Sequence, residues 1–499
     1  MKNKGQVTVL CSCMISILLI LTLTALEVGR IYCSRLKLRA VVHSAQSSIM
    51  ADYNRELFER YHLLFIDPTY GTGSDAMAEE RLRDYMEESL NDSEHKGNLY
   101  SFSVEEIALI DKRTITDDHM KDLKKQIIEY EKEGGAINKI VDLGKNMTDP
   151  SEDIKKAGEK TERNAVELPK DEGGAGDKDT AGNTETGDND TEEEVEDPRE
   201  VLKKNLKLGI LALVLPEHAE VSKEKQDFSK AVSHTYEEKE DRLKDNEFED
   251  VSKLIGLLGD SAKDKDNLLF GVESKAAFCA YVTDHFSYQG RPKGSVMKCE
   301  IEYILKGKDN DYDNLSSVVS EIIWMRMPIN YVCIIKDAEK QSEALTLATA
   351  ICSATGTMPM VEIVKYLLLG CWSYGESIYE VRQLMHGHKI PFVKTSANWN
   401  TDLKTLGAKG EGGSVESGMD YKDYLCILLA RKEGKDITYA RMLDMIEKNL
   451  QKEDENLTVV NMCGSLTIEG KVSMNPLLTD RGDENVYEYG FEEKIEYCH

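Results

Sequence analysis

The sequence lacks most of the motifs that signal enzymatic chemistry. Of its eleven cysteines, three lie in or beside an apolar run near the start of the chain, and the other eight are scattered singly without CxxC pairs, a spacing that argues against a zinc site or a small disulfide scaffold. It contains no GxSxG nucleophile elbow, no Walker A loop and no DxSxS metal-binding run. Basic residues are outnumbered 63 to 91, and the net charge of -28 argues against nucleic acid as a partner. We therefore predict no catalytic residue, no cofactor, no metal site and no enzyme activity.

Three short patterns still offer weak alternatives. His386 and His388 form an HxH pair at an expected helix end, but no third metal ligand lies nearby in the sequence. Glu376 falls in an apolar helix, where a buried carboxyl can act as an acid or base or make a structural ion pair. Arg382 is its possible partner on that helix. An RGD string at 481–483 is too short to indicate adhesion.

A long apolar run near the start of the chain is the strongest signal. Val7 to Leu26 is a stretch of 20 residues without a charge, which matches the ~20 residues needed to cross a bilayer. A cleaved secretory signal has a shorter apolar region, of about 7–15 residues, and a small-x-small cleavage site, which "TALEVGRIY" does not supply. The run therefore indicates a retained transmembrane helix, with a cleaved signal as the alternative.

The charges that flank the run leave its orientation open. Lys2 and Lys4 precede it, whereas four basic residues follow it closely: Arg30, Arg35, Lys37 and Arg39. Counted alone, these charges would place the large domain in the cytoplasm, because positive residues favour that side of the membrane.

The helical pattern continues beyond the apolar run. Apolar residues recur at spacings of three and four along one face, and no Pro or Gly interrupts residues 31–66. This stripe comprises Leu38, Val42, Ala45, Ile49, Tyr53 and Leu57. It predicts one helix, or two nearly collinear ones, that packs either on the chain's own globular part or on neighbouring copies.

The N-terminal region resembles a known family. The leader "KNKG", the immediate apolar span, the segment "LEVGR" and the long amphipathic helix look like the TadE/TadG-type pseudopilins of tight-adherence (Flp, type IVb) pilus systems. The resemblance implies prepilin-peptidase cleavage between Gly5 and Gln6, and it matches Glu27, Gly29 and Arg30 to an acid-x-Gly-Arg segment common at the end of the apolar span in that family. Pilins usually carry glutamate at the fifth mature position, which is Leu10 here, so an anchor is favoured over a polymerising pilin.

The rest of the chain is predicted to be α+β and mostly helical. We expect a leader and transmembrane helix at 1–27, a stalk helix and small subdomain at 28–148, an acidic disordered linker at 149–200 and a main globular domain at 201–499. The linker is expected because residues 161–200 hold 15 acidic and 4 basic residues and almost no apolar side chains.

Several elements are expected within these parts. Residues 51–145 read as helices and turns, and the alternation from Met297 to Leu305 predicts a strand that ends at Gly307. The uncharged run 344–361 predicts a buried helical hairpin, split at 356–359, rather than a second membrane span. Residues 456–476 read as paired strands.

The C-terminal part also resembles an uncharacterised family of Gram-positive bacterial proteins grouped with tight-adherence components. The segments "CEIEYILKGKDNDYDNL" and "WSYGESIYEVRQLMHGHKIPFVKT" carry this resemblance. It implies a structural protein of the cell membrane, with a single span and an extracytoplasmic domain. Its expected partners are the membrane, other pilus or secretion-apparatus proteins, and copies of itself through the N-terminal helix. The alternative is a bitopic sensor or membrane-tethered enzyme with a site around Glu376.

Overall fold

The chain is mostly helical, with one antiparallel sheet and a long N-terminal apolar helix, in a computed structural model. The structure describes residues 4–91, 100–134, 197–217, 219–236, 265–392, 394–406, 418–476 and 486–497. The predicted linker, 149–200, lies outside these residues except for its last four, and the RGD string lies outside them entirely. The chain forms two compact units, residues 1–130 with 446–499, and residues 131–445.

Unit 1 is built around α1, which spans Lys4–Met50 and is 47 residues long. At 1.5 Å per residue this helix extends about 70 Å. Helix α1 ends at Met50, and α2 (Arg55–Tyr61) follows after a short turn. Asn54 caps α2, because its side chain accepts a hydrogen bond from the Leu57 backbone N–H at 2.8 Å. The predicted stalk is therefore two helices joined by a short turn.

The sheet of unit 1 combines strands from distant parts of the chain. Its strands are β1 (Phe102–Thr114), β2 (Cys463–Met474) and β3 (Tyr487–Glu496). The order is β1-β2-β3, both pairs are antiparallel, and Phe102 lies opposite Met474. At Gly470 a Cβ would stand 2.4 Å from the Phe491 ring, so the crossing of that ring over β2 requires glycine.

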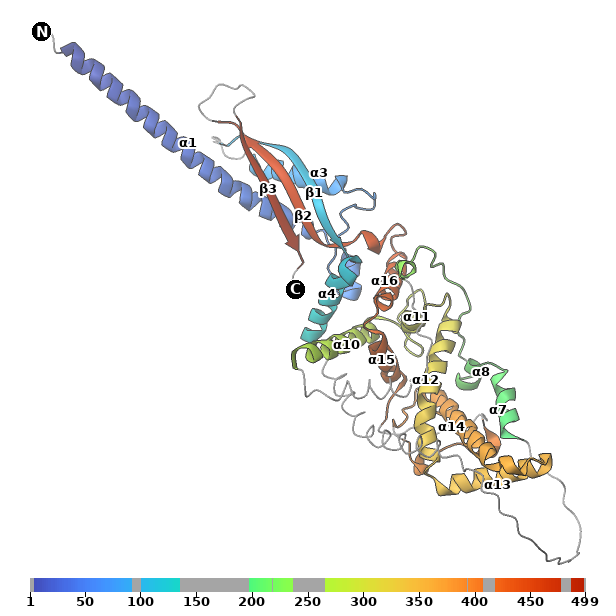
Figure 1. Cartoon of the computed structure of the whole chain (residues 1–499). Helices are drawn as coiled ribbons and strands as arrows, with labels where there is room; N and C mark the ends of the chain where they lie inside the picture. The colour runs from blue at the N-terminus through green and yellow to red at the C-terminus, as the bar shows by residue number, and fades with distance from the viewer. Residues whose placement is uncertain are drawn as a thin grey trace, which may run out of the picture. The chain divides into compact units, whose positions relative to one another are not determined.

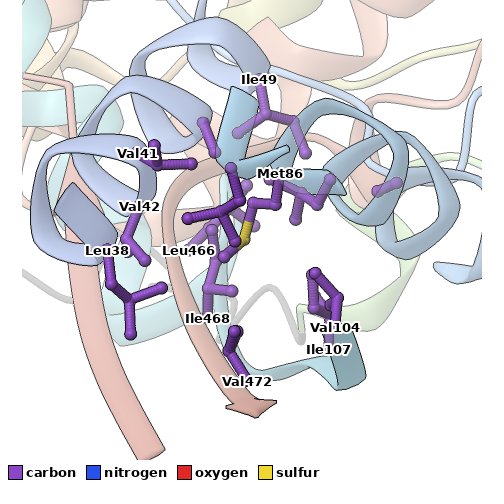
Figure 2. Packing of buried hydrophobic residues seen from close by; sticks show 14 of the residues in the cluster. Leu38, Val41, Val42, Ile49, Met86, Val104, Ile107, Leu466, Ile468 and Val472 are labelled. Atoms are coloured by element: carbon purple, nitrogen blue, oxygen red, sulfur yellow. The ribbon is translucent and has the colours of Figure 1, made fainter. Parts of the chain in front are cut away.

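The core of unit 1 lies between this sheet, α1 and α3 (Ala76–Leu90). Figure 2 shows side chains of all three elements meeting there. The stripe residues Leu38, Val42, Ala45 and Ile49 of α1 are all buried in this cluster. Of the two interpretations of the stripe, packing on the chain's own globular part is the one observed.

Unit 2 is a helical assembly in its described part (Figure 1). Its longer helices pack as the pairs α12 with α14, α13 with α14, and α10 with α15. The bounds are α7 Pro198–Leu206, α8 Ile210–Val214, α10 Lys265–His285, α11 Glu300–Lys306, α12 Asp311–Ile334, α13 Ala338–Thr355, α14 Val361–Met385, α15 Tyr421–Lys432 and α16 Asp436–Leu450. A last helix, α4 (Asp117–Gly134), runs from unit 1 to the first residues of unit 2, and α16 likewise contributes to both units.

Two elements differ from the sequence predictions. The predicted strand at Met297–Leu305 is wrong, because this segment contains helix α11, which does end at Gly307. Its alternation misleads because Glu300 and Glu302 are buried rather than solvent-facing. Each accepts a backbone hydrogen bond, Glu300 from Ser287 at 2.7 Å and Glu302 from Gln289 at 3.0 Å.

The second difference concerns the sheet. Strand β1 falls in 51–145, where only helices and turns were predicted, and residues 456–476 form one strand rather than a pair. The partners of β2 come from elsewhere in the chain, so the C-terminal segment completes unit 1. The observed units thus divide the chain differently from the predicted boundary at residue 201.

We predict that the stripe of α1 is needed for the stability of unit 1. Leu38 is 5% exposed and Leu36 is 56% exposed on the same helix. Leu38→Ala should lower the free energy of unfolding by about 2–5 kcal/mol, because it leaves a cavity against the sheet. Leu36→Ala should change it by less than about 0.5 kcal/mol. Urea titration of the full chain in detergent measures both, and equal effects would contradict burial of the stripe within this fold.

Candidate functional site

The apolar run forms the uncovered first half of α1. Side chains from Gln6 to Leu26 are exposed, and among the described helices α1 alone is long and apolar enough by itself to cross a membrane. The hydroxyls of Ser16, Thr22 and Thr24 each donate to a backbone carbonyl one turn earlier, at 2.9 Å. These bonds satisfy the polar groups of the run within the helix, as a hydrocarbon environment requires.

An ion pair marks the end of this exposed segment. Arg30 donates to Glu27 through Nη2 at 2.8 Å and through Nε at 3.1 Å. Its Nη2 also donates to the backbone carbonyl of Asn475, which follows β2, at 2.6 Å. Arg30 is only 8% exposed, so the first charged residues after the run are fixed against the sheet of unit 1.

Aromatic side chains surround α1 over the next two turns. Ser34 shares a hydrogen bond with Tyr489 of β3 at 2.9 Å, and the Arg35 guanidinium lies 5.8 Å from the centre of the same ring. Lys37 donates to the carbonyl of Leu90 at 2.5 Å. Its ammonium also lies 5.9 Å from the ring centres of Tyr100 and Phe102. Burial and the neighbouring Glu27 carboxylate raise the pKa of Tyr487 above its ordinary value.

We call this arrangement the collar. It comprises Glu27, Arg30, Ser34, Arg35 and Lys37 of α1, with Tyr100, Phe102, Tyr487 and Tyr489 from the segments around it. Tyrosine and basic side chains are the residues that concentrate where a membrane helix leaves the hydrocarbon. The collar therefore has the residue types of such a boundary, and it joins the end of the apolar run to the sheet of unit 1.

The structure places the predicted N-terminal residues as follows. Gly5 and Gln6 lie in the first turns of α1, and Leu10 is exposed. Glu27 and Arg30 contact each other, whereas Gly29 is exposed, and a Cβ built on it would meet nothing within 4 Å. Cleavage after Gly5 stays a prediction. Nothing in the sequence alone indicated that β3 and Asn475 would meet this segment.

The second candidate, Glu376, belongs to a buried cluster of charges in unit 2. Its Oε1 lies 2.6 Å from the ammonium of Lys394, and its Oε2 accepts from the backbone N–H and hydroxyl of Thr401 at 2.9 and 2.6 Å. Both ion-paired side chains are at most 1% exposed. Glu376 therefore makes the structural ion pair that the sequence offered as one alternative.

The cluster extends through Glu380. Lys394 also lies 3.2 Å from Glu380, which binds both Nε and Nη2 of Arg326 at 2.9 and 2.8 Å. Burial alone would raise the pKa of Glu380, but the charges of Arg326 and Lys394 hold it below its ordinary value. Two carboxylates and two cations thus balance one another inside the helices. The lone arginine in the apolar sequence "IIWMRMPIN" was the sequence signal for this cluster.

The remaining candidate residues of the sequence analysis do not join the cluster around Glu376. Arg382 does not contact Glu376 as expected but donates to the carbonyl of Leu213 at 2.7 Å. His386 ends α14, and its Nδ1 lies 2.7 Å from the carbonyl of Arg382. Within the described ranges, no three His, Cys, Asp or Glu side chains converge as a metal site would require. The ten described cysteines are free thiols.

Glu302 is a buried carboxyl of unit 2 whose pKa is raised toward neutral pH. Its Oε1 accepts from the Gln289 backbone N–H and from the Tyr421 hydroxyl, at 3.0 and 2.8 Å. Its Oε2 is buried and has no hydrogen-bond partner among the described residues. Burial raises the pKa of Glu302 to about 7, which the two hydrogen bonds only partly oppose.

Comparison with known proteins identifies a family match. Residues 188–474, more than half of the chain, match the model of a family described as a family of unknown function, DUF5702. The matched region includes β2 but neither β1, β3 nor the apolar helix. No curated protein and no solved structure matches the chain.

The collar leads to a prediction about local stability. Arg30→Met should weaken the attachment of α1 to the sheet by about 1–3 kcal/mol, because it removes the bond to Asn475 and leaves Glu27 without its ion pair. Hydrogen exchange should become faster in 486–497 of the full chain. Arg39→Met, at an exposed position on the same helix, is the matched control. Unchanged exchange in Arg30→Met would show that the pair does not hold the sheet.

The pKa of Glu302 gives a pH prediction. With a folded pKa of about 7 and an ordinary value of 4.5, the unfolded state releases its proton first as pH rises. The free energy of unfolding should therefore fall between these two pH values, by up to roughly 3 kcal/mol, and level off above them. Glu302→Gln should remove this part of the fall in urea titrations. Glu224→Gln, at an exposed site, should retain it, and identical profiles for both variants would contradict the assignment.

Proposed function

The chain belongs to DUF5702, a family of unknown function, and we propose that it is a membrane-anchored structural protein, a minor pseudopilin-like component of a tight-adherence pilus or related secretion apparatus. The observation that carries this proposal is the division of α1 into two halves. The first half, from Gln6 to Leu26, is uncovered and apolar, and the second half is packed on the sheet of unit 1. A membrane anchor that is also part of a folded domain requires one half that is free to enter the bilayer and one half that packs on the domain.

The collar supports a fixed position of that base relative to the bilayer. The uncharged run from Val7 to Leu26 is about 30 Å long as a helix, which is the thickness of the hydrocarbon core. The aromatic and basic residues of the collar begin where this length ends. On this proposal the run crosses the cell membrane once, and both units lie outside the cytoplasm.

The packing of the stripe also limits where copies can meet. Leu38 to Ile49 are occupied by the chain's own sheet, so self-association would use the membrane-embedded half of α1. Small residues there, such as Ser12, Ser16 and Ala25, and the open surface at Gly29 allow close approach of a second helix. The resemblance of "LEVGR" and its surroundings to TadE/TadG-type proteins supplies the link to a pilus.

The alternative is a bitopic sensor or tethered enzyme that uses Glu376. Both oxygens of this carboxylate already accept hydrogen bonds, and Lys394 pairs with it in a site closed to solvent. This arrangement favours a structural role and supports the first proposal over the second. Glu376→Gln separates them, because a sensor or enzyme would lose its output, whereas pilus assembly would depend only on whether the variant folds.

The proposal predicts an integral protein whose loss prevents assembly. The full chain should stay in the membrane fraction after alkaline carbonate treatment, and protease added to intact cells should digest unit 2. Deletion of the gene should remove assembled pili from the surface, and the wild-type gene should restore them. Mass spectrometry of the mature N-terminus adds a further result: a start at Gln6 would support pilin-like processing.

Three outcomes would contradict the proposal. Release by carbonate would exclude the anchor, and protection of unit 2 in intact cells would exclude the extracytoplasmic location. Unchanged pili or secretion in the deletion strain would exclude the structural role, even if the anchor and the topology hold.

A further inference from the structure

Unit 2 carries a group of exposed apolar side chains at the turn between α13 and α14. Figure 1 labels these two helices. Outside α1, eleven large hydrophobic residues of the described chain are exposed, and five of them lie within residues 358–367. We call these five the apolar tip: Met358, Met360, Ile363, Tyr366 and Leu367. Scattered single exposures need no explanation, but a group of this kind marks a contact surface.

The tip rests on a firmly packed base. Helix α13 ends at Gly356, whose left-handed φ of 69° turns the chain, and a short 3₁₀ turn, Met358–Met360, leads into α14. Behind the tip, Leu369 and Trp372 of α14 are buried against Ala344 of α13. The exposed side chains therefore belong to ordered helices. The sequence prediction of a buried hairpin is correct for its base and not for its tip.

The tip lacks charge over most of its length. Residues 344–361 contain no charged side chain, in a protein whose net charge is -28. Two charged residues, Glu362 and Lys365, lie between the apolar residues of the tip. They pair with each other at 3.3 Å, and the Lys365 ammonium lies 5.1 Å from the ring centre of Tyr366. The turn up to residue 361 is thus uncharged, and the two charges that follow it neutralise each other.

An aromatic pair lies farther along the same face. Ile363, Leu367 and Tyr374 fall on one side of α14, because 4 and 11 residues are close to whole numbers of helical turns. Trp324 of α12 is 52% exposed, and its ring centre lies 5.5 Å from that of Tyr374. From the end of the hairpin, Met358, Met360 and Ile363 thus come first, Tyr366 follows within the tip, and the pair Trp324 and Tyr374 lies behind it. The apolar run and collar of α1 likewise place apolar residues before aromatic ones.

We propose that the apolar tip inserts into the surface of the membrane that α1 spans, with Trp324 at the level of the headgroups. This inference rests on the membrane anchor of the proposed function. Three features favour lipid as the occupant: the proposed anchor tethers the chain to a bilayer, the tip is a turn rather than a groove and is uncharged up to residue 361, and aromatic residues lie beside it, as they do at membrane interfaces. Because the tether raises the local concentration of lipid, weak insertion is sufficient.

Trp324 allows a direct test with the full chain. The protein is reconstituted into phosphatidylcholine vesicles whose acyl chains carry bromine, which quenches tryptophan emission on contact. Of the three tryptophans, Trp372 is 2% exposed and Trp399 has a buried indole nitrogen, so the signal lost in Trp324→Phe isolates Trp324. We expect this signal to be quenched and shifted to shorter wavelength in bilayers.

Matched variants assign the effect to the tip. Ile363→Glu adds a charge at an exposed position of the tip and should abolish most of the quenching, without loss of folding. Leu208→Glu adds the same charge at a position of unit 2 that is 69% exposed and should leave the quenching unchanged. Quenching that persists in Ile363→Glu would overturn the proposal.

The anchor and the tip can fail separately. Vesicles that float with the protein but do not quench Trp324 would overturn insertion of the tip and leave the anchor standing. Protein that does not float would refute the anchor itself. Protection of Trp324 from an aqueous quencher that rises with protein concentration, without quenching by brominated lipid, would assign the tip to a second copy and overturn the lipid proposal.

Discussion

The burial of one face of α1 is the constraint on which unit 1 depends. A helix whose first half is uncovered and apolar can be part of a folded domain only if its second half packs on something. Here that partner is a three-stranded sheet with α3, and the buried stripe from Leu38 to Ile49 joins them. The sheet in turn exists only because β2 brings the C-terminal part of the chain between β1 and β3. One hydrophobic interface thus decides which distant segments form a domain.

Unit 2 contains a buried cluster of balanced charges. Its helices enclose Arg326, Glu376, Glu380 and Lys394, four charges that would be costly in an apolar interior if any one were removed. Each carboxylate pairs with a cation and accepts further hydrogen bonds. The cluster therefore specifies that the segment after α14, which carries Lys394, lies against α14 and α12. Lys394 links the segment after α14 to the centre of the helical assembly. A buried cluster of this kind fixes geometry and need not perform chemistry.

The sequence predicted local features well and distant ones poorly. The extent of the apolar run, the stripe and the hairpin split near Gly356 follow from periodicity and turn residues, and the structure agrees with them. Strand β1 was missed because its pairing partner is encoded near the other end of the chain. Helix α11 was mistaken for a strand because the alternating pattern predicts that Glu300 and Glu302 face solvent. In the structure both carboxylates are buried and accept backbone hydrogen bonds inside the fold. Lys394 could not be paired with Glu376 from spacing alone.

The position of β2 and β3 has a consequence for synthesis. All of unit 2 is translated before residue 446, whereas β2, the central strand of the sheet in unit 1, is translated after it. The helical unit can therefore fold while the stripe of α1 is still without its sheet. Unit 1 therefore begins with α1 before unit 2 is made and is completed only after it, and the uncovered stripe of α1 must be kept from other hydrophobic surfaces until β2 and β3 are made.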